Sequence, residues 1–416
     1  MSSNQHLEIV PSNITADGKL SFRNGQPVVQ FIIGEQARYL IGSSVRLCGK
    51  FTCNSGSTTT PTSTSATGLR MNEQLGVYGA LSELHIKSQR TAQSIETIRH
   101  YSRMMSSYLG VTSSLQDGIS HLNETALIDM NWACQQRGVV ENPTSETTSN
   151  SFCIPLVCGL LNGTEPIPLA ESWGVGGLDI SLHLSPDSNV FFASSNASLS
   201  NITNSFYELS EVRLVCEVMT PAPDQLSRLM SSTQEVFEYN SIVSQFNTIN
   251  SRNGILNFFD GLATLPPTNS DGTRAEITQA VFTRGGERFP LEYNIDTLQR
   301  DDATNDTMDA QIVRNYMNAV MGFSRIFRTN VSPDNNKYDD YGTEYEYAKT
   351  IIQGGSKFGL GVNYDQISGE GVSFMDVPFG LQLTSDLSTD SPQGIYLFAH
   401  CKNTVVSTPQ GIQVLN

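Results

Sequence analysis

Charged side chains are scarce in this sequence of 416 residues. Asp, Glu, Lys and Arg make up 16% of it, against about 25% in an average soluble domain. There are 41 acidic and 25 basic residues, so the formal net charge is −16. No run of Lys or Arg occurs, and Lys19 is the only such residue among the first twenty. Because proteins bind nucleic acids through Lys and Arg at the phosphates, we expect no direct sequence-specific nucleic-acid binding.

Long apolar segments are missing as well. The longest apolar runs fall far short of the ~18 residues that a membrane-spanning helix needs. Residues 1–12 are polar and lack the apolar stretch of a secretory signal peptide. We therefore expect no bilayer-spanning helix and no signal peptide.

Cysteine and histidine motifs are absent in the spacings that bind zinc. The seven cysteines include no CxxC pair, and the six histidines are scattered, whereas zinc sites use closely paired ligands. An odd count, with Cys53 and Cys216 on apolar faces of expected strands, predicts buried free thiols. The cysteines are Cys48, Cys53, Cys134, Cys153, Cys158, Cys216 and Cys401. The sequence thus predicts no metal site from these residues.

A strict two-residue alternation is what the sequence does contain. Between Leu178 and Leu184, apolar residues alternate with Asp179, Ser181 and His183. Successive side chains of a strand point to opposite faces, so this pattern predicts a sheet with one packed face. His183 falls on the polar face, which indicates a surface or interface histidine. The same alternation returns at Val45–Cys53, Val212–Val218, Phe289–Ile295 and Phe379–Leu383.

Helices and loops are fewer. Apolar residues at helical spacing predict helices at 92–109 and 308–322. Segments rich in Ser and Thr at 55–68, 143–151 and 194–204 cannot bury a face and are expected to be exposed loops.

The β pattern stops near the middle of the chain. Pro221 and Pro223, followed by a short helical stretch, mark a domain boundary. We expect a first domain at 1–220, a linker at 221–234 and a second domain at 235–416. Each half contains about eight strands separated by Pro/Gly turns and long loops. The sequence therefore predicts an all-β protein with a few short helices, built as two tandem eight-stranded antiparallel jelly rolls, which are β-sandwiches.

Particular stretches carry a resemblance to a known family. They are residues 84–89, 95–103, 154–161, 166–169 and 176–182 in the first half, and 285–293, 311–316 and 378–386 in the second. In these stretches, and in its two tandem jelly rolls, the chain resembles the double jelly-roll major capsid proteins of tailless icosahedral DNA viruses. That lineage includes virophages, polinton-like viruses and the large nucleocytoplasmic viruses.

The resemblance implies a structural role in the virion. A capsid protein of this kind forms a homotrimer with a pseudo-hexameric outline, tiled as a hexon-like capsomer beside neighbouring capsomers and penton or minor capsid proteins. It is made in the host cell, and contact with the genome is left to an internal membrane or to other proteins. The missing basic arm agrees with this expectation.

Catalytic and metal-binding alternatives find little support in the sequence. Gly174–Gly177 lacks the further glycine and the helix of a phosphate-binding loop, so we interpret it as a turn. Ser, His and Asp occur without any nucleophile motif. The acidic clusters at 301–309 and 334–346 lack EF-hand spacing, and solvated loop is favoured there over a calcium site. We therefore predict no enzyme activity, no catalytic residues, no cofactor and no metal.

A binding role remains as the alternative. Trp132 and Trp173 could stack on sugar rings, which would fit a receptor- or carbohydrate-binding β-sandwich of the spike or penton type, although core or interface packing is the simpler interpretation. A single jelly roll with an appended domain, and a sandwich enzyme acting on glycans through paired carboxylates, also stay open.

Overall fold

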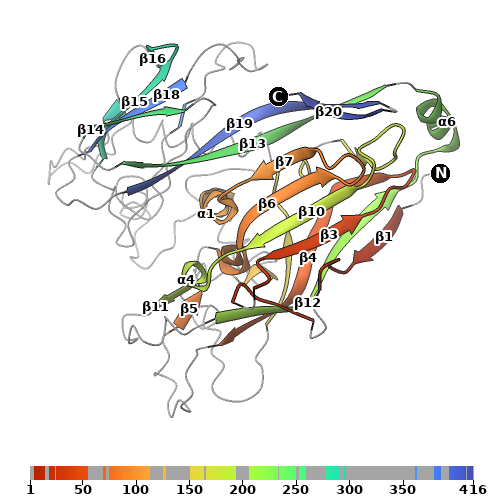
Figure 1. The fold of residues 1–416 in the computed structure, drawn as a ribbon, viewed down its shortest axis with the longest axis horizontal. Helices are drawn as coiled ribbons and strands as arrows, with labels where there is room; N and C mark the ends of the chain where they lie inside the picture. Colours follow the sequence, from red (N-terminus) through yellow and green to blue (C-terminus); the bar gives the residue numbers. More distant parts are fainter. Residues whose placement is uncertain are drawn as a thin grey trace. The chain divides into compact units, whose positions relative to one another are not determined.

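The computed structural model describes part of the chain, and this part is drawn in colour in Figure 1. The described residues are 4–14, 18–23, 25–54, 69–71, 75–112, 125–127, 150–163, 165–193, 206–232, 234–249, 253–258, 277–289, 295–296, 361–362, 379–385, 393–408 and 410–415. They divide into two compact units. The first comprises residues 1–105, 115–241 and 402–416, and the second comprises 106–114 and 242–401.

The first unit contains two antiparallel sheets. One has the strand order β1-β12-β4-β8, with β2 paired to β12 and β9 paired to β4. Its strands are β1 (Asn4–Ile9), β2 (Lys19–Leu20), β4 (Tyr39–Asn54), β8 (Asn150–Pro155), β9 (Ile167–Pro168) and β12 (Phe206–Met219). The other sheet has the order β3-β10-β6-β7. Its strands are β3 (Val28–Ile33), β6 (Leu81–Ser88), β7 (Ser94–Ile98) and β10 (Leu178–Leu184).

The two sheets enclose an apolar core. On β10, Leu178, Ile180, Leu182 and Leu184 are buried while the residues between them are half-exposed. The Tyr207 hydroxyl on β12 donates a hydrogen bond of 2.6 Å to the carbonyl of Ser185, just beyond β10. A strand of one sheet is thereby tied to the end of a strand in the other. The alternation read from the sequence at 178–184 is confirmed as a sandwich strand.

Two further strand predictions are confirmed in this unit. Val45, Leu47 and Phe51 are buried on β4. Even-numbered residues from Val212 to Val218 are buried on β12. The unit also contains short elements, namely β5 (Leu69–Met71) paired with β11 (Phe191–Ala193), the 3₁₀ helix η1 (Gly76–Ala80) and helix α4 (Asp187–Val190).

The helix predicted at 92–109 is wrong in its first part. Ser94–Ile98 forms β7, which pairs with β6, and helix α1 begins only at Tyr101 and ends at Thr112. The pairing register shifts between Lys87–Ser94 and Ile86–Glu96, which leaves Ile95 as an extra residue. Ile95 and Ile98 are both buried for this reason, and their spacing imitates a helix. His100 has φ 59°, so a helix cannot run through the junction.

A further short helix, α6 (Pro223–Ser231), follows β12, and it confirms the helical stretch expected after the two prolines. Beyond it, β13 (Glu235–Ile249), β19 (Gln393–Thr408) and β20 (Gly411–Leu415) form a three-stranded sheet. The division between the two compact units falls within β13 and β19. Domain limits at 220 and 235 remain a prediction.

The second unit contains another antiparallel sheet, in the order β14-β18-β15-β16, with β17 paired to β15. The strands are β14 (Asn253–Phe258), β15 (Ile277–Arg284), β16 (Glu287–Phe289), β17 (Ile295–Asp296) and β18 (Phe379–Ser385). Ala280, Phe282, Leu381 and Leu383 are buried. The strand expected at Phe379–Leu383 is confirmed, and of the strand expected at Phe289–Ile295 only the two ends are described.

Several expected elements lie outside the described residues. They are the helix at 308–322, the loops at 55–68 and 194–204, and nearly all of the loop at 143–151. Within the described ranges, no helix has the length and hydropathy that a bilayer span requires.

Candidate functional site

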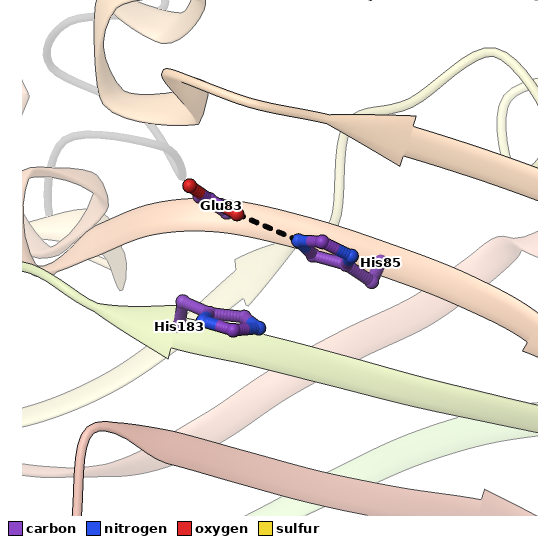
Figure 2. A group of neighbouring side chains, drawn as sticks. All are labelled: Glu83, His85 and His183. Carbon is purple, nitrogen blue, oxygen red and sulfur yellow. Dashed lines mark hydrogen bonds and ion pairs between the residues drawn. The ribbon is translucent and has the colours of Figure 1, made fainter.

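In the part of the first unit that the structure describes, a carboxylate and two imidazoles lie together on the outward face of the sheet β3-β10-β6-β7. Glu83 and His85 are two residues apart on β6, so both side chains leave the same face. His183 on β10 is paired directly opposite Glu83. Figure 2 shows the carboxylate and the two imidazoles gathered over these two neighbouring strands. We call these three residues the His-Glu cluster.

The atoms of the His-Glu cluster are close together. Nε2 of His85 lies 2.7 Å from a carboxylate oxygen of Glu83. The imidazole rings of His85 and His183 have centroids 4.6 Å apart and an interplanar angle of 33°. One nitrogen or oxygen from each residue lies within 4.8 Å of the corresponding atoms of the other two. All three residues are half-buried, and the side chains of His85 and Glu83 are 19% and 34% exposed.

Burial is the largest influence on the pKa of His183. Its partial burial, and then the nearby His85 imidazole, hold the pKa of His183 below its usual value, while Glu83 opposes the shift. Lys87, on the same face of β6, also lowers this pKa. The lowered pKa favours a neutral imidazole at pH 7, with a nitrogen lone pair available.

The sequence identified only one member of the His-Glu cluster. His183 was expected on a polar strand face, and the structure places it there. The contribution of Glu83 and His85 was missed because it depends on the pairing of β6 with β10, which lie almost a hundred residues apart. The local signal that could have pointed to them is the Glu-x-His spacing, since both residues then share a face.

A second polar feature is the buried carboxylate of Glu96 on β7. Its oxygens accept hydrogen bonds from the backbone N–H groups of Gly159 (3.1 Å) and Leu160 (2.8 Å) and from the hydroxyl of Ser241 (3.3 Å). Burial raises the pKa of Glu96 despite these bonds. The carboxylate joins the turn at 158–161 to strand β13, so its role is structural support within the first unit.

Gly174–Gly177 is confirmed as a turn leading into β10. The backbone N–H groups of Val175, Gly176 and Gly177 donate to the carbonyls of Pro168, Ala170 and Leu169. These donors are therefore engaged within the protein. A phosphate-binding loop needs its N–H groups directed at the ligand, which these are not.

Trp173 is part of the core. It is 1% exposed, and its ring packs against Tyr39 with centroids 5.1 Å apart. Its indole face is therefore unavailable to a sugar, which removes half of the basis for a carbohydrate-binding role. Trp132 and both acidic clusters, at 301–309 and 334–346, lie outside the described residues.

The cysteines are distributed over several strands. Cys216 is buried on β12, and burial raises its pKa to about 11. Cys158 is buried beside Glu96. Cys48 and Cys153 are half-buried partners on β4 and β8. The prediction of buried thiols holds for Cys158 and Cys216 and is wrong for Cys48, Cys153 and Cys401, which are only half-buried. The side chain of Cys53 and all of Cys134 are not described.

Comparisons with known proteins give matches at the level of structure. No protein-family model and no curated sequence matches the chain. Its fold is similar to that of the Faustovirus major capsid protein, with a TM-score of 0.54 at 8% identity, covering 97% of this chain and 90% of the other. It is also similar to the mavirus major capsid protein, with a TM-score of 0.51 at 10% identity, covering 99% and 90%.

A third similar structure is the capsid of the virus PBCV-1, with a TM-score of 0.54 at 9% identity, covering 100% of this chain and 97% of the other. These solved structures are double jelly-roll capsid proteins. The all-β, double jelly-roll fold predicted from the sequence is thereby confirmed.

Proposed function

We propose that this chain is the major capsid protein of an icosahedral virus and that its function is structural. The observation that carries the proposal is the match in fold over nearly the whole chain to several viral major capsid proteins. A match to one sandwich alone would be expected of many unrelated β proteins. A match that runs through both units of one chain is far more restrictive.

We further propose the assembly that this function needs. Three copies form a hexon-like capsomer with a pseudo-hexameric outline, in which residues 1–220 and 235–416 supply one jelly roll each. The capsomer packs against neighbouring capsomers and penton or minor capsid proteins in the virion. The chain has no catalytic activity and no cofactor in this proposal, and it does not read nucleic-acid sequence, in keeping with its net charge of −16.

Exposed apolar side chains in the described part of the chain support association. Val10, Met230 and Leu415 are 67%, 69% and 53% exposed. Burying such surface in a contact between copies is favourable by roughly 25 cal/mol per Å². The low content of charged residues also reduces repulsion between like surfaces.

Size-exclusion chromatography with light scattering of the purified full chain tests the assembly. We expect a species three times the mass of one chain at micromolar concentration, because obligate interfaces commonly bury more than ~2,000 Å². A stable, folded monomer under these conditions would contradict the trimer. Electron microscopy of the same sample should show particles with a pseudo-hexagonal outline, and particles of another symmetry would contradict the hexon-like capsomer.

A further inference from the structure

The His-Glu cluster has a donor set that the capsid role does not require. Two imidazole nitrogens and one carboxylate oxygen, from Glu83, His85 and His183, meet on the outward face of one sheet. Among the described residues, this is the one group of three His, Cys, Asp or Glu side chains with ligand atoms close enough to share an ion. Packing against the core does not explain it, because the three side chains leave the opposite face of the sheet from Leu84 and Leu182.

The chemistry of these donors selects a class of metal. Imidazole nitrogen suits zinc, copper, nickel and iron, whereas calcium and magnesium prefer six or more oxygen ligands. Two His and one Glu are a known ligand set for zinc, with water in the fourth position. The half-exposed setting of the cluster leaves such a position open on the solvent side.

The distances between the ligand atoms of the His-Glu cluster suit a zinc ion. Zinc–nitrogen and zinc–oxygen bonds of about 2.0–2.2 Å hold neighbouring ligand atoms roughly 3.3 Å apart in a tetrahedron. The three atoms here lie within 4.8 Å of one another, and the His85–Glu83 pair is at 2.7 Å. We therefore expect side-chain rotation alone to bring all three atoms to a common centre, without displacement of the strands.

The scaffold is suited to hold the ligands in place. β6 and β10 are the two inner strands of their sheet, each paired on both sides. The Ser82 hydroxyl donates a hydrogen bond of 3.1 Å to the carbonyl of His183, which adds a link between the two strands at the cluster itself. Ligands placed on rigid strands lose little conformational entropy when an ion binds.

We propose that Glu83, His85 and His183 form a binding site for a divalent transition-metal ion, Zn²⁺ in the first place, with water as the fourth ligand. The bound ion cross-links β6 and β10 on the outward face of the sheet. The site carries a single carboxylate, and Lys87 lies nearby. We therefore expect an affinity in the micromolar range rather than that of a closed four-ligand structural site.

Isothermal titration calorimetry of the metal-free full chain with ZnCl₂ tests the proposal. We expect one site of micromolar affinity for zinc per chain, and no comparable binding of MgCl₂ or CaCl₂. His85→Gln and His183→Gln should each weaken zinc binding at least about tenfold, and zinc should raise the melting temperature of the wild type but of neither variant. The proposal is overturned if the wild type binds no zinc, or if both variants bind it as tightly as the wild type.

His6→Gln is the matched control. His6 also lies beside a glutamate, with its Nδ1 3.6 Å from Glu217, but on exposed strand β1 and without a second histidine. This variant should bind zinc like the wild type, and a loss of binding equal to that of His85→Gln would contradict the assignment. Circular dichroism and the elution volume from size-exclusion chromatography check that each variant is folded. If a histidine variant does not fold, Glu83→Gln takes its place in the titration.

X-ray absorption of the wild type with one equivalent of Zn²⁺ needs no variant. We expect a first shell of nitrogen and oxygen only, with the outer-shell scattering of two imidazoles. Sulfur in the first shell would assign the zinc to cysteines and overturn the proposal.

Discussion

Cys48 and Cys153 face each other across the antiparallel strands β4 and β8, with their Sγ atoms 2.8 Å apart. The Cys48 thiol donates a hydrogen bond to the sulfur of Cys153. Burial, and secondarily this bond, raise the pKa of Cys48 to about 12. The pair is therefore a dithiol at neutral pH whose geometry is close to that of a cross-strand disulfide.

We expect glutathione disulfide to convert this pair to an intramolecular disulfide. Two thiols and one glutathione disulfide give one Cys48–Cys153 bond and two molecules of glutathione, so electrons and protons balance. The thiolate is the attacking species, and the rate should therefore increase as pH rises from 7 towards 10. Mass spectrometry of non-reduced peptides measures the linked pair against time and pH.

Oxidation should also stabilise the fold. The bond closes a loop of about 100 residues, for which the chain-entropy argument gives up to about 4–5 kcal/mol before strain is subtracted. Thermal melts of oxidised and reduced protein check this. Cys153→Ser should abolish the difference and Cys401→Ser should preserve it, whereas a difference that survives in Cys153→Ser would assign it to other cysteines.

Gly159 lies against strand β13 with no room for a side chain. A Cβ atom at this position would be 1.5 Å from the carbonyl oxygen of Asn240. The obstacle is backbone, so it cannot rotate away. Gly159→Ala should destabilise the protein by about 3 kcal/mol, since either the turn at 158–161 or β13 must move.

Gly34→Ala is the control for Gly159→Ala, because nothing lies within 4 Å of a Cβ built there. We expect its effect to stay within about 0.5 kcal/mol. Melting temperatures of the two variants, measured side by side, compare them. Equal melting temperatures would show that β13 does not pack closely on the turn.

Alternation with a period of two correctly predicted the strands at 178–184, 45–53, 212–218 and 379–383, because it depends only on neighbouring residues. Leu178–Leu184 is the clearest example. The same reasoning failed at Ile95 and Ile98, where a register shift places residues three apart on one buried side. Apolar spacing alone cannot separate an irregular strand from a helix.

The His-Glu cluster could not be predicted for a different reason. Glu83 and His183 become neighbours only through the pairing of β6 with β10. That register is set by the burial of Leu84, Ile86 and Leu182 on the other face of the sheet. One sequence shows which residues share a face of one strand, but not which strand lies beside it.

The Glu96 carboxylate predicts a specific pH dependence. Its pKa is raised in the folded protein by burial, so the folded state holds this proton more tightly than the unfolded chain does. The free energy of unfolding contributed by Glu96 therefore decreases as pH rises from about 4.3, the ordinary value, through the raised folded-state pKa. This stabilising contribution is fully present only at pH values below the pKa of Glu96 in the unfolded chain.

Glu96→Gln removes this titration. An amide also directs an NH₂ group at one of the two backbone N–H donors, Gly159 or Leu160, so the variant should be less stable than the wild type. The loss should be largest near pH 4 and smaller at pH 7, because ionisation lowers the stability of the wild type alone. Cys158, Tyr239 and Ser241 are unchanged neighbours in both proteins.

Urea unfolding of the wild type and of Glu96→Gln between pH 4 and pH 8 measures how the difference in their free energies of unfolding changes with pH. Glu165→Gln, at an exposed position, should give a curve parallel to that of the wild type. A Glu96→Gln curve that is also parallel to the wild type would show that the carboxyl does not titrate with a raised pKa.

Glu211 sits at a β-bulge in β12. Ser210 pairs with Lys50 and Arg213 pairs with Cys48, so Glu211 and Val212 together oppose one residue of β4. Glu211 has φ 52°, a left-handed conformation that costs a non-glycine residue roughly 1–2 kcal/mol. The extra residue changes which positions face the core, from Tyr207 and Leu209 before the bulge to Val212 and Leu214 after it. The bulge therefore allows a single long strand to keep apolar side chains inward.

The stability of variants at Glu211 should depend on whether the new residue tolerates a positive φ, and not on its strand propensity. Glu211→Gly and Glu211→Val both remove the exposed ion pair with Lys50, which contributes little. Only glycine relieves the positive φ, so Glu211→Gly should melt at a higher temperature than Glu211→Val. At Glu208, a regularly paired position of the same strand that also has a lysine partner, the order should reverse, because valine suits a pleated strand and glycine weakens it. Melting temperatures of the four variants test this, and the same order at both positions would contradict a left-handed Glu211.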